Sequence, residues 1–284
     1  MRISSAMMLP VLGTLASHDY SRRVNEYAEL EERPGKERLL EHATSMSALG
    51  YAMMGSSAAI MHGSSMKERA EIASACIDAG CLLGLADDAV DETGMSFMDA
   101  VNYLDLGREV LEGLQEKKYK SPQLDAPMML ARMLYERLSD RADYYAFLAP
   151  VFDATEAAVS RMNSDEKEDL IRCLENEGRY SGEVIPGVAK AVAGHEDGLV
   201  RYAFGLFGEH CQLLDTVADA EHDMEQGINT PFRYCANDEE RASVRMNLLE
   251  RAENAKLEAV SSLPVNQRKF FEPLFVISRL KYGQ

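Results

Sequence analysis

Two short stretches of the chain place several carboxylates inside otherwise apolar sequence. Residues 85–92 read LADDAVDE, and residues 213–223 read LLDTVADAEHD. An ionised carboxylate is costly near apolar groups unless a partner or water offsets its charge. Carboxylate oxygens are the ligands that hard divalent cations such as Mg²⁺ prefer. Both stretches are therefore candidates for metal binding; the alternative is that each is a solvated helix surface.

The first acidic group, Asp87, Asp88 and Asp91, lies at the end of a predicted helix. Its segment, IASACIDAGCLLGLADDAVDE, carries apolar residues at helical spacing. At about 100° per residue, the three carboxylates share one side of this helix. The helix dipole disfavours anions at that end, and no basic residue stands three or four positions away. A bound cation explains this arrangement best.

The second acidic group, Asp215, Asp219 and Asp223, is spaced in steps of four residues. On a helix these carboxylates form a stripe about 12 Å long, which Gln212 continues upstream. Mg²⁺ prefers one or two carboxylates together with water and a substrate phosphate, and no His pair or Cys cluster competes for a softer metal. Together the two groups predict one shared metal site.

The elements that carry these groups are predicted to be helices. Apolar residues recur three and four positions apart along nearly the whole chain, and no run alternates as a strand would. About eight or nine helices follow, and no Gly-, Ser- or Pro-rich linker divides residues 1–284, so we expect one all-α domain. Breaks are expected at 32–36, 63–66, 93–96, 118–123, 163–166, 194–198, 226–231, 236–240 and 262–266.

Composition restricts the partners and the compartment. The 284 residues are 46% hydrophobic and carry a formal charge of −17, which argues against nucleic acid or an anionic membrane surface as partner. Five cysteines without a zinc-type pair indicate reduced thiols in a cytoplasmic protein. No apolar run approaches the ~20 residues that span a bilayer. Pro10 and Gly13 interrupt the N-terminal apolar run, which favours a first core helix over a secretion signal.

The segment 164–193 is rich in residues that weaken helices. Gly178, Gly182, Pro186 and Gly187 fall within ten residues. They predict either a kinked helix or two helices joined by a turn. A break here would let the side chain of Arg179 turn inward.

At these residues the sequence resembles class I isoprenoid synthases, the superfamily of trans-prenyltransferases, squalene and phytoene synthases and class I terpene cyclases. DDAVD matches the DDxxD pattern of that superfamily, and QLLDTVADAEHDMEQGINTPF resembles its second aspartate-rich helix, with Asp219 and Asp223 on the DxxxD positions. Asp215 falls where terpene cyclases begin their own metal motif. The resemblance implies a single helical bundle with a central cavity, across which the two acidic helices face each other.

The resemblance also implies a chemistry, the ionisation of an allylic prenyl diphosphate. Mg²⁺, or alternatively Mn²⁺, would bridge the acidic helices and bind the diphosphate. Asp87, Asp219 and Arg179 are then expected to be catalytic. Basic and phenolic candidates for diphosphate contacts, each alternatively a surface residue, are Arg179, Arg233, Arg279, Lys281 and Tyr282. Met and Phe side chains would line a dry pocket or form ordinary core, namely Met53, Met54, Met61, Phe147, Phe152, Phe204 and Phe207.

Three departures from the superfamily bear on the reaction. No paired arginines follow DDxxD, and Gly35, Lys36 and Arg38 only loosely match the Gly-Lys-x-x-Arg site for a homoallylic substrate. Only 61 residues follow Asp223. These differences favour a terpene synthase that uses one diphosphate over a prenyltransferase that couples two. A non-catalytic scaffold and a hydrolase of other phosphates are further alternatives. Substrate length, product skeleton, and monomer or homodimer stay open.

Overall fold

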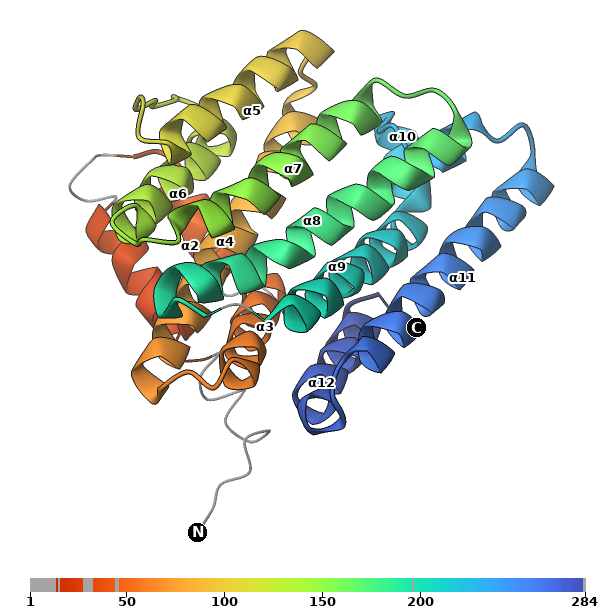
Figure 1. The fold of residues 1–284 in the computed structure, drawn as a ribbon. Helices are drawn as coiled ribbons and strands as arrows, with labels where there is room; N and C mark the ends of the chain where they lie inside the picture. Colours follow the sequence, from red (N-terminus) through yellow and green to blue (C-terminus); the bar gives the residue numbers. More distant parts are fainter. Residues whose placement is uncertain (1–13, 15, 28–32, 44–45, 196, 283–284) are drawn as a thin grey trace. The chain divides into compact units, whose positions relative to one another are not determined.

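The computed structural model describes residues 14–282 except for 15, 28–32, 44–45 and 196. Within these residues every regular element is a helix and no strand occurs (Figure 1), as the apolar periodicity predicts. No helix in the described ranges is both long and apolar enough to cross a membrane. Residues 16–27 are helical, whereas most of the predicted N-terminal core helix lies outside the described residues.

The chain divides into two compact units, each described by itself. The first unit comprises Met1–Ala149 with Val184–Asp197, and the second comprises Pro150–Glu183 with Gly198–Gln284. In the first unit the helices after residues 16–27 are α2 (Lys36–Ala43), α3 (Met46–Met61), α4 (Met66–Thr93), α5 (Phe97–Leu111) and α6 (Pro122–Leu138). The second unit contains α9 (Gly198–Ala218), α10 (Ala220–Gln226), the 3₁₀ helix η1 (Pro231–Tyr234), α11 (Asp238–Ser262) and α12 (Val265–Tyr282). Helices α7 (Tyr144–Met162) and α8 (Lys167–Ala193) contribute to both units. The single domain stays a prediction.

Most helix boundaries fall where Gly, Pro and polar clusters predict them, but the described helices outnumber the expected eight or nine. One additional break, residues 139–143, separates α6 from α7. Another lies at Asp219, between α9 and α10. Neither place contains Gly or Pro, the strongest local breaking signals.

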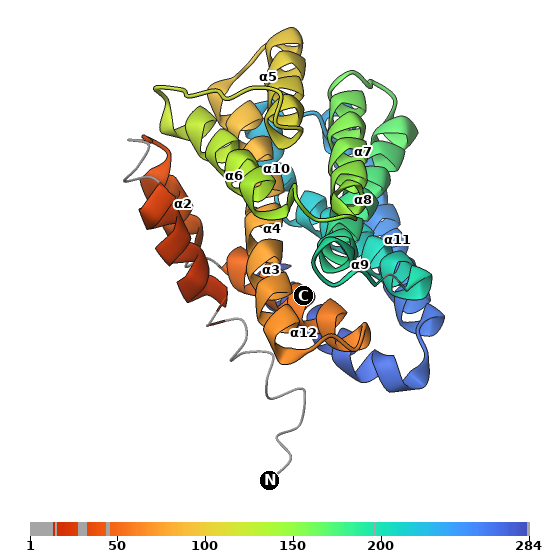
Figure 2. The ribbon, with the colours of Figure 1, turned by 60° about the vertical axis from the view of Figure 1, so that its left-hand side comes forward.

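Helix α4 forms the centre of the first unit. It packs against α3 and α6, and α5 lies beside α6 (Figure 2). Ile72, Ile77 and Leu85 of α4 are fully buried. The approach to α3 is close at Gly80, where an added Cβ would lie 2.2 Å from the Tyr51 ring. The sequence prediction of a mostly buried helix ending in DDAVD is therefore confirmed.

A buried carboxylate fixes α4 to its neighbours. Asp78 has no exposed surface and accepts hydrogen bonds at 2.8 Å from Arg23, in helix 16–27, and from Arg137, in α6. Arg137 also contacts Ser74, one turn earlier on α4. Removing one partner of such a network leaves an uncompensated buried charge, which costs several kcal/mol. Asp78 therefore has a structural role, distinct from that of the acidic group farther along the helix.

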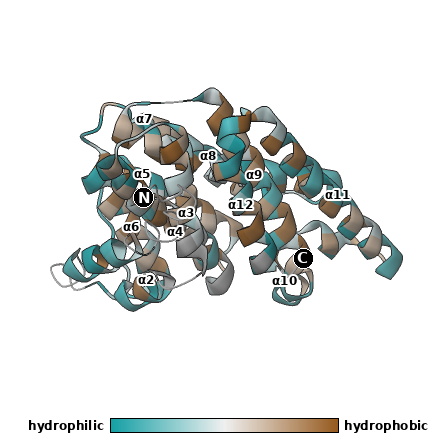
Figure 3. Cartoon of the chain, turned by 90° about the horizontal axis from the view of Figure 1, so that it is seen from below, coloured by the Kyte–Doolittle hydropathy of each residue, from teal (hydrophilic) through white to brown (hydrophobic). Residues whose placement is uncertain are grey.

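One part of the core of the second unit, between α9 and α12, is aromatic. Phe204 and Phe207 of α9 pack edge to face on Phe271 and Phe275 of α12, with ring centroids 5.0 to 5.9 Å apart. Such aromatic pairs add stability beyond the area that they bury. Figure 3 shows hydrophobic segments on α9 and α12, whereas the outer end of α11 is hydrophilic. Of the two roles expected for Phe204 and Phe207, pocket lining or ordinary core, these contacts favour ordinary core.

Helix α8 runs without a break from Lys167 to Ala193. Of the two alternatives that the sequence leaves open, two helices joined by a turn is therefore wrong. In the second unit the glycines let α8 approach α9 closely. A Cβ on Gly182 would lie 2.1 Å from the Phe204 carbonyl oxygen, and a Cβ on Gly208 would lie 2.1 Å from the Gly178 oxygen. Tertiary packing, and not a turn, accounts for these glycines.

Candidate metal sites

The first acidic group lies at the C-terminal end of α4, as predicted. Asp87 is exposed and Asp88 is half-buried. Asp91 belongs to the same helix, but its side chain is outside the described part of the structure. The Arg38 Nη2 of α2 donates to Asp88 Oδ2 over 3.2 Å. A basic partner from a distant segment thus offsets part of the charge at this helix end.

The second acidic group keeps its four-residue spacing although the helix is interrupted. Asp215 lies in the last turn of α9, Asp219 precedes α10 with φ −97° and ψ 8°, and Asp223 lies in α10. The Asp219 N–H donates to the Asp215 carbonyl over 2.9 Å, and the Asp223 N–H donates to the Asp219 carbonyl over 2.8 Å. These helix-like bonds preserve the stripe. The prediction of one continuous helix is wrong in this detail, since Asp competes with helical backbone bonding and favours helix ends.

The second acidic group carries more negative charge than its neighbours offset. Burial raises the pKa of Asp219, and the neighbouring Asp215 raises it further. Burial, followed by Asp219 and Asp215, raises the pKa of Asp223 to about 6. The Lys281 Nζ lies 3.5 Å from Asp215 Oδ1 and supplies a partial counter-charge. Crowded carboxylates whose ionisation is disfavoured fit a divalent cation, which would offset their charge.

The present side-chain positions do not close a metal cage. Among the described residues, no three His, Cys, Asp or Glu side chains converge closely enough to hold an ion. Mg²⁺ commonly takes only one or two carboxylates and completes its octahedron with water and substrate phosphate. The acidic groups therefore fit an ion that arrives with a phosphate ligand better than a permanently bound structural metal.

The raised pKa of Asp223 predicts a pH-dependent stability in the metal-free protein. Its carboxyl stabilises the fold while protonated, below about pH 4, and this contribution is lost as the pH rises through about 6. Asp223→Asn should therefore raise the unfolding free energy at pH 7.5 by about 1 kcal/mol, after discounting for solvent screening, and raise Tm by about 2 °C. Thermal unfolding of the variant and the wild type in chelator, at pH 7.5 and at pH 4, measures this difference in Tm. A lower Tm at pH 7.5 would instead give Asp223 a structural role.

A buried arginine that sequence reasoning missed lies near the second acidic group. Arg161 of α7 is 6% exposed, and its Nε donates to Glu177 Oε2 over 3.0 Å. Its positive charge opposes the rise in the Asp223 pKa. The Asn229 amide donates to the Arg161 carbonyl over 2.7 Å and so ties the loop after α10 to the end of α7. Nothing in the local sequence distinguishes Arg161 from a surface residue.

The side chain of Arg179 does not turn inward at a helix break, because α8 is unbroken at this residue. Its Nε and Nη2 donate to Glu209 Oε2 of α9 over 3.1 and 2.5 Å. The guanidinium is thus paired within the second unit, and the unbroken α8 gives the side chain no turn at which to leave its helix face. Arg179 is a poorer candidate for a diphosphate contact than its position between two glycines predicts.

Arg233 supports the turn that follows the second acidic group. Its Nη1 donates to the Gly227 carbonyl over 2.7 Å. Gly227 ends α10 with a φ of 73°, a left-handed conformation that residues other than glycine rarely adopt. The side chain of Arg233 is exposed, and its visible function is to hold this turn.

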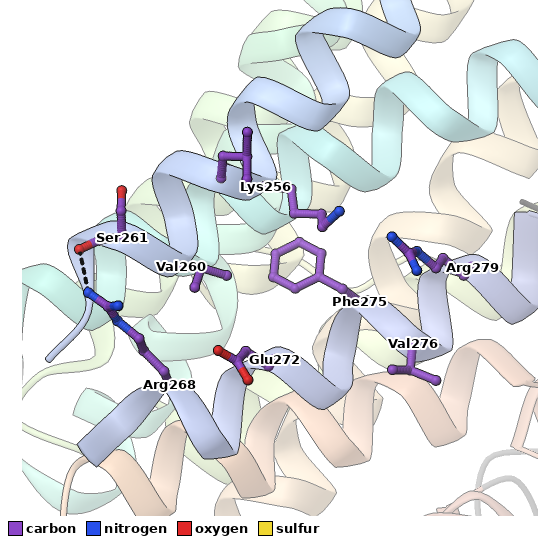
Figure 4. A pocket seen from close by; sticks show the side chains of 9 residues that line it. Lys256, Val260, Ser261, Arg268, Glu272, Phe275, Val276 and Arg279 are labelled. Carbon is purple, nitrogen blue, oxygen red and sulfur yellow. Dashed lines mark hydrogen bonds between the residues drawn. The ribbon is translucent and has the colours of Figure 1, made fainter. Parts of the chain in front are cut away.

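The three C-terminal candidates separate onto different faces of α12. Lys281 lies beside Asp215, and its Nζ also donates to the Tyr282 hydroxyl over 2.9 Å. Arg279 instead lines a groove of about 500 Å³ between α11 and α12, where Figure 4 shows it together with Lys256 and Phe275. Residues two positions apart on a helix differ by about 200° in direction, which explains the split. Lys281 and Tyr282 remain near the second acidic group, and Arg279 belongs to the groove.

Comparisons with known proteins bear on the fold. No protein-family model matches the chain, and no curated protein matches it. A geranyltranstransferase from Methanosarcina mazei superposes with a TM-score of 0.57 at 14% identity, over 94% of this chain and 98% of that one. A geranylgeranyl pyrophosphate synthetase from the archaeon Geoglobus acetivorans gives 0.55 at 12%, over 95% and 99%.

The chain has the fold of these two proteins. The all-α, isoprenoid-synthase-type fold that the two acidic motifs predict is thereby confirmed. The same fold can serve different reactions, so the chemistry has to be argued from the side chains. That the acidic helices face each other across a cavity, and that they share metal ions, stay predictions.

Proposed function

We propose that the protein is a Mg²⁺-dependent enzyme that acts on an allylic prenyl diphosphate, and that both acidic groups contribute to binding the metal and the diphosphate. The observation that carries the proposal is the second acidic group. Its three aspartates keep their spacing across a helix break, and burial, followed by the charge of the neighbouring aspartates, raises the pKa values of Asp219 and Asp223. The fold shared with two prenyl diphosphate synthases supports the same reaction class.

Between the two reactions that the sequence leaves open, we now favour the prenyltransferase, which couples two isoprenoid diphosphates. Both structural neighbours bear names of that type, which reverses the preference for a terpene synthase. The first unit adds a second argument. Arg38, from the segment that loosely matches the Gly-Lys-x-x-Arg site, contacts Asp88 of the DDxxD motif. A basic segment beside the metal motif suits a second diphosphate.

The protein's own residues would divide the work of binding. When bound, Mg²⁺ supplies Lewis-acid charge that stabilises the leaving diphosphate. Asp87, Asp88, Asp91, Asp215, Asp219 and Asp223 would hold the ions through carboxylate oxygens. The Lys281 ammonium, beside Asp215, would donate to a diphosphate oxygen and offset its negative charge. Tyr282, within hydrogen-bond distance of Lys281, would fix the position of that ammonium.

We therefore propose Lys281, in place of Arg179, as the basic residue whose contact with the diphosphate should be tested first. Lys281→Met should lower kcat/KM for the allylic diphosphate by about tenfold, because one charged donor to the diphosphate is lost. Lys269→Met is the matched control on the same helix. The Lys269 nitrogen lies over the Phe270 ring, 4.9 Å from its centroid, so this variant should leave kcat/KM unchanged. Steady-state kinetics of both variants measure the difference. Equal kcat/KM values would remove Lys281 from the site.

Two other classes of function make different predictions. A non-catalytic scaffold of the same fold would show no metal-dependent thermal stabilisation by inorganic diphosphate, whereas an enzyme should. A phosphate hydrolase would convert an allylic diphosphate only to its prenyl alcohol. The five cysteines are free, which is consistent with the cytoplasmic location that we propose. One domain over residues 1–284 stays a prediction, and the choice between monomer and homodimer stays open.

A further inference from the structure

The DDxxD motif receives a cationic partner from a segment 50 residues away. Arg38 Nη2 lies 3.2 Å from Asp88 Oδ2. The two side chains are 21% and 43% exposed, so the pair is only partly screened by solvent. Helix α4 provides no basic residue of its own near this end, where its dipole already disfavours anions. Arg38 supplies the counter-charge that the helix lacks.

The position of Arg38 is fixed by a buried ion pair directly upstream. Arg33 and Asp125 have fully buried side chains, and Arg33 Nη2 donates to Asp125 Oδ1 over 2.8 Å. Asp125 also accepts the Gly35 N–H over 3.2 Å and the Tyr119 N–H over 3.0 Å. The segment before α2 is thereby attached to α6 through several bonds, which orients the helix that carries Arg38.

Close packing at Gly35 holds the same segment. A Cβ at Gly35 would lie 2.6 Å from the Ala126 backbone nitrogen, so only glycine allows this approach. Helix α2 begins at the next residue, Lys36, and Arg38 follows within its first turn. Two independent features, a buried ion pair and a backbone contact, thus determine where the Arg38 guanidinium can reach.

We infer that Arg38 is the internal counter-ion of the DDxxD motif: it neutralises Asp88 while no metal is bound, and a metal ion has to displace it from the carboxylate. This inference rests on the proposed function, since it assigns metal binding to Asp88. Once displaced, the guanidinium keeps a charge and several fixed donors that match phosphate oxygens. Metal binding at Asp88 and anion binding at Arg38 would then favour each other, which makes the metal and the diphosphate bind cooperatively.

This role predicts effects of opposite sign on two ligands. Arg38→Gln removes a competitor for the Asp88 carboxylate, so Mn²⁺ alone should bind roughly threefold more tightly, the scale of a partly exposed ion pair. Inorganic diphosphate in the presence of Mn²⁺ should bind about tenfold more weakly, because a charged donor is lost. Arg38→Lys keeps the charge and should bind Mn²⁺ alone as the wild type does.

The experiment measures Mn²⁺ binding to the full chain by electron paramagnetic resonance, and diphosphate binding by calorimetry at saturating Mn²⁺. Arg132→Gln is the matched control, since Arg132 also makes an ion pair in the first unit, with Glu136 over 2.8 Å, and should change neither affinity. Arg38→Met, which keeps an apolar stem, replaces Arg38→Gln if the latter fails to fold.

The possible results separate this inference from the proposed function. Tighter Mn²⁺ binding with weaker diphosphate binding in Arg38→Gln supports the counter-ion role. Unchanged or weaker Mn²⁺ binding in that variant, with normal binding by the wild type, overturns the inference alone. A wild-type protein that binds neither Mn²⁺ nor diphosphate overturns the proposed function and the inference with it.

Discussion

Replacing Asp219 by Asn is expected to lower the turnover of an allylic prenyl diphosphate by about 100-fold or more while leaving the fold intact. Asp219 lies at the centre of the second acidic group, and burial followed by the charge of Asp215 raises its pKa. Removing one of several crowded like charges relieves repulsion in the metal-free protein, so Tm should stay equal or rise. Diphosphate release and thermal unfolding in chelator measure the two effects.

The control for this variant is Asp238→Asn in α11. Asp238 has a 98% exposed side chain in the same unit, so its replacement should leave turnover unchanged. If Asp219→Asn unfolds the protein as it loses activity, Asp219 has a structural role. If the variant keeps normal turnover, the metal is bound elsewhere and the function must be reassigned.

Among the variants proposed for test, the largest effect on stability is expected at the glycine contact between α8 and α9. Gly182→Ala would place a Cβ 2.1 Å from the Phe204 carbonyl oxygen, which belongs to backbone that cannot move aside as a side chain can. Forcing the helices apart should cost about 2 to 3 kcal/mol, the upper range for overpacking in a well-packed interior. Chemical denaturation of the variant and the wild type measures the loss.

Gly84→Ala is the matched control, because it makes the same change inside α4 where a Cβ would meet nothing within 4 Å. Ala is the better helix former, so this variant should gain roughly 0.5 to 1 kcal/mol. Opposite signs for the two substitutions would establish packing as the cause. Equal stability of Gly182→Ala and the wild type would show that the helices separate readily, and the contact would then contribute little.

Local periodicity explains what the sequence predicts well. The all-α class, most helix boundaries, and the position of Asp87 and Asp88 at the end of a buried helix all follow from spacing within one helix. The four-step aspartate stripe also persists, because backbone bonds continue past the break at Asp219. These features depend on neighbours a few residues away, which a single sequence displays directly.

Contacts between distant segments explain what the sequence does not predict. Arg38 and Asp88 are 50 residues apart, and Arg33 and Asp125 are 92 residues apart. No periodic pattern marks such pairs. The same limit applies to Arg179, whose flanking glycines suggest a local turn but serve the packing of α8 on α9. Propensity is a weak prior that tertiary contacts override.

The central claim is that the protein ionises an allylic diphosphate with Mg²⁺, and one measurement tests it most directly. The protein is incubated with geranyl, farnesyl or geranylgeranyl diphosphate, each with and without a homoallylic diphosphate and with Mg²⁺ or chelator, and diphosphate release and organic products are measured. We predict Mg²⁺-dependent diphosphate release and, with the homoallylic partner, a product longer by one isoprene unit. No diphosphate release from any of the three substrates under any condition would contradict the claim.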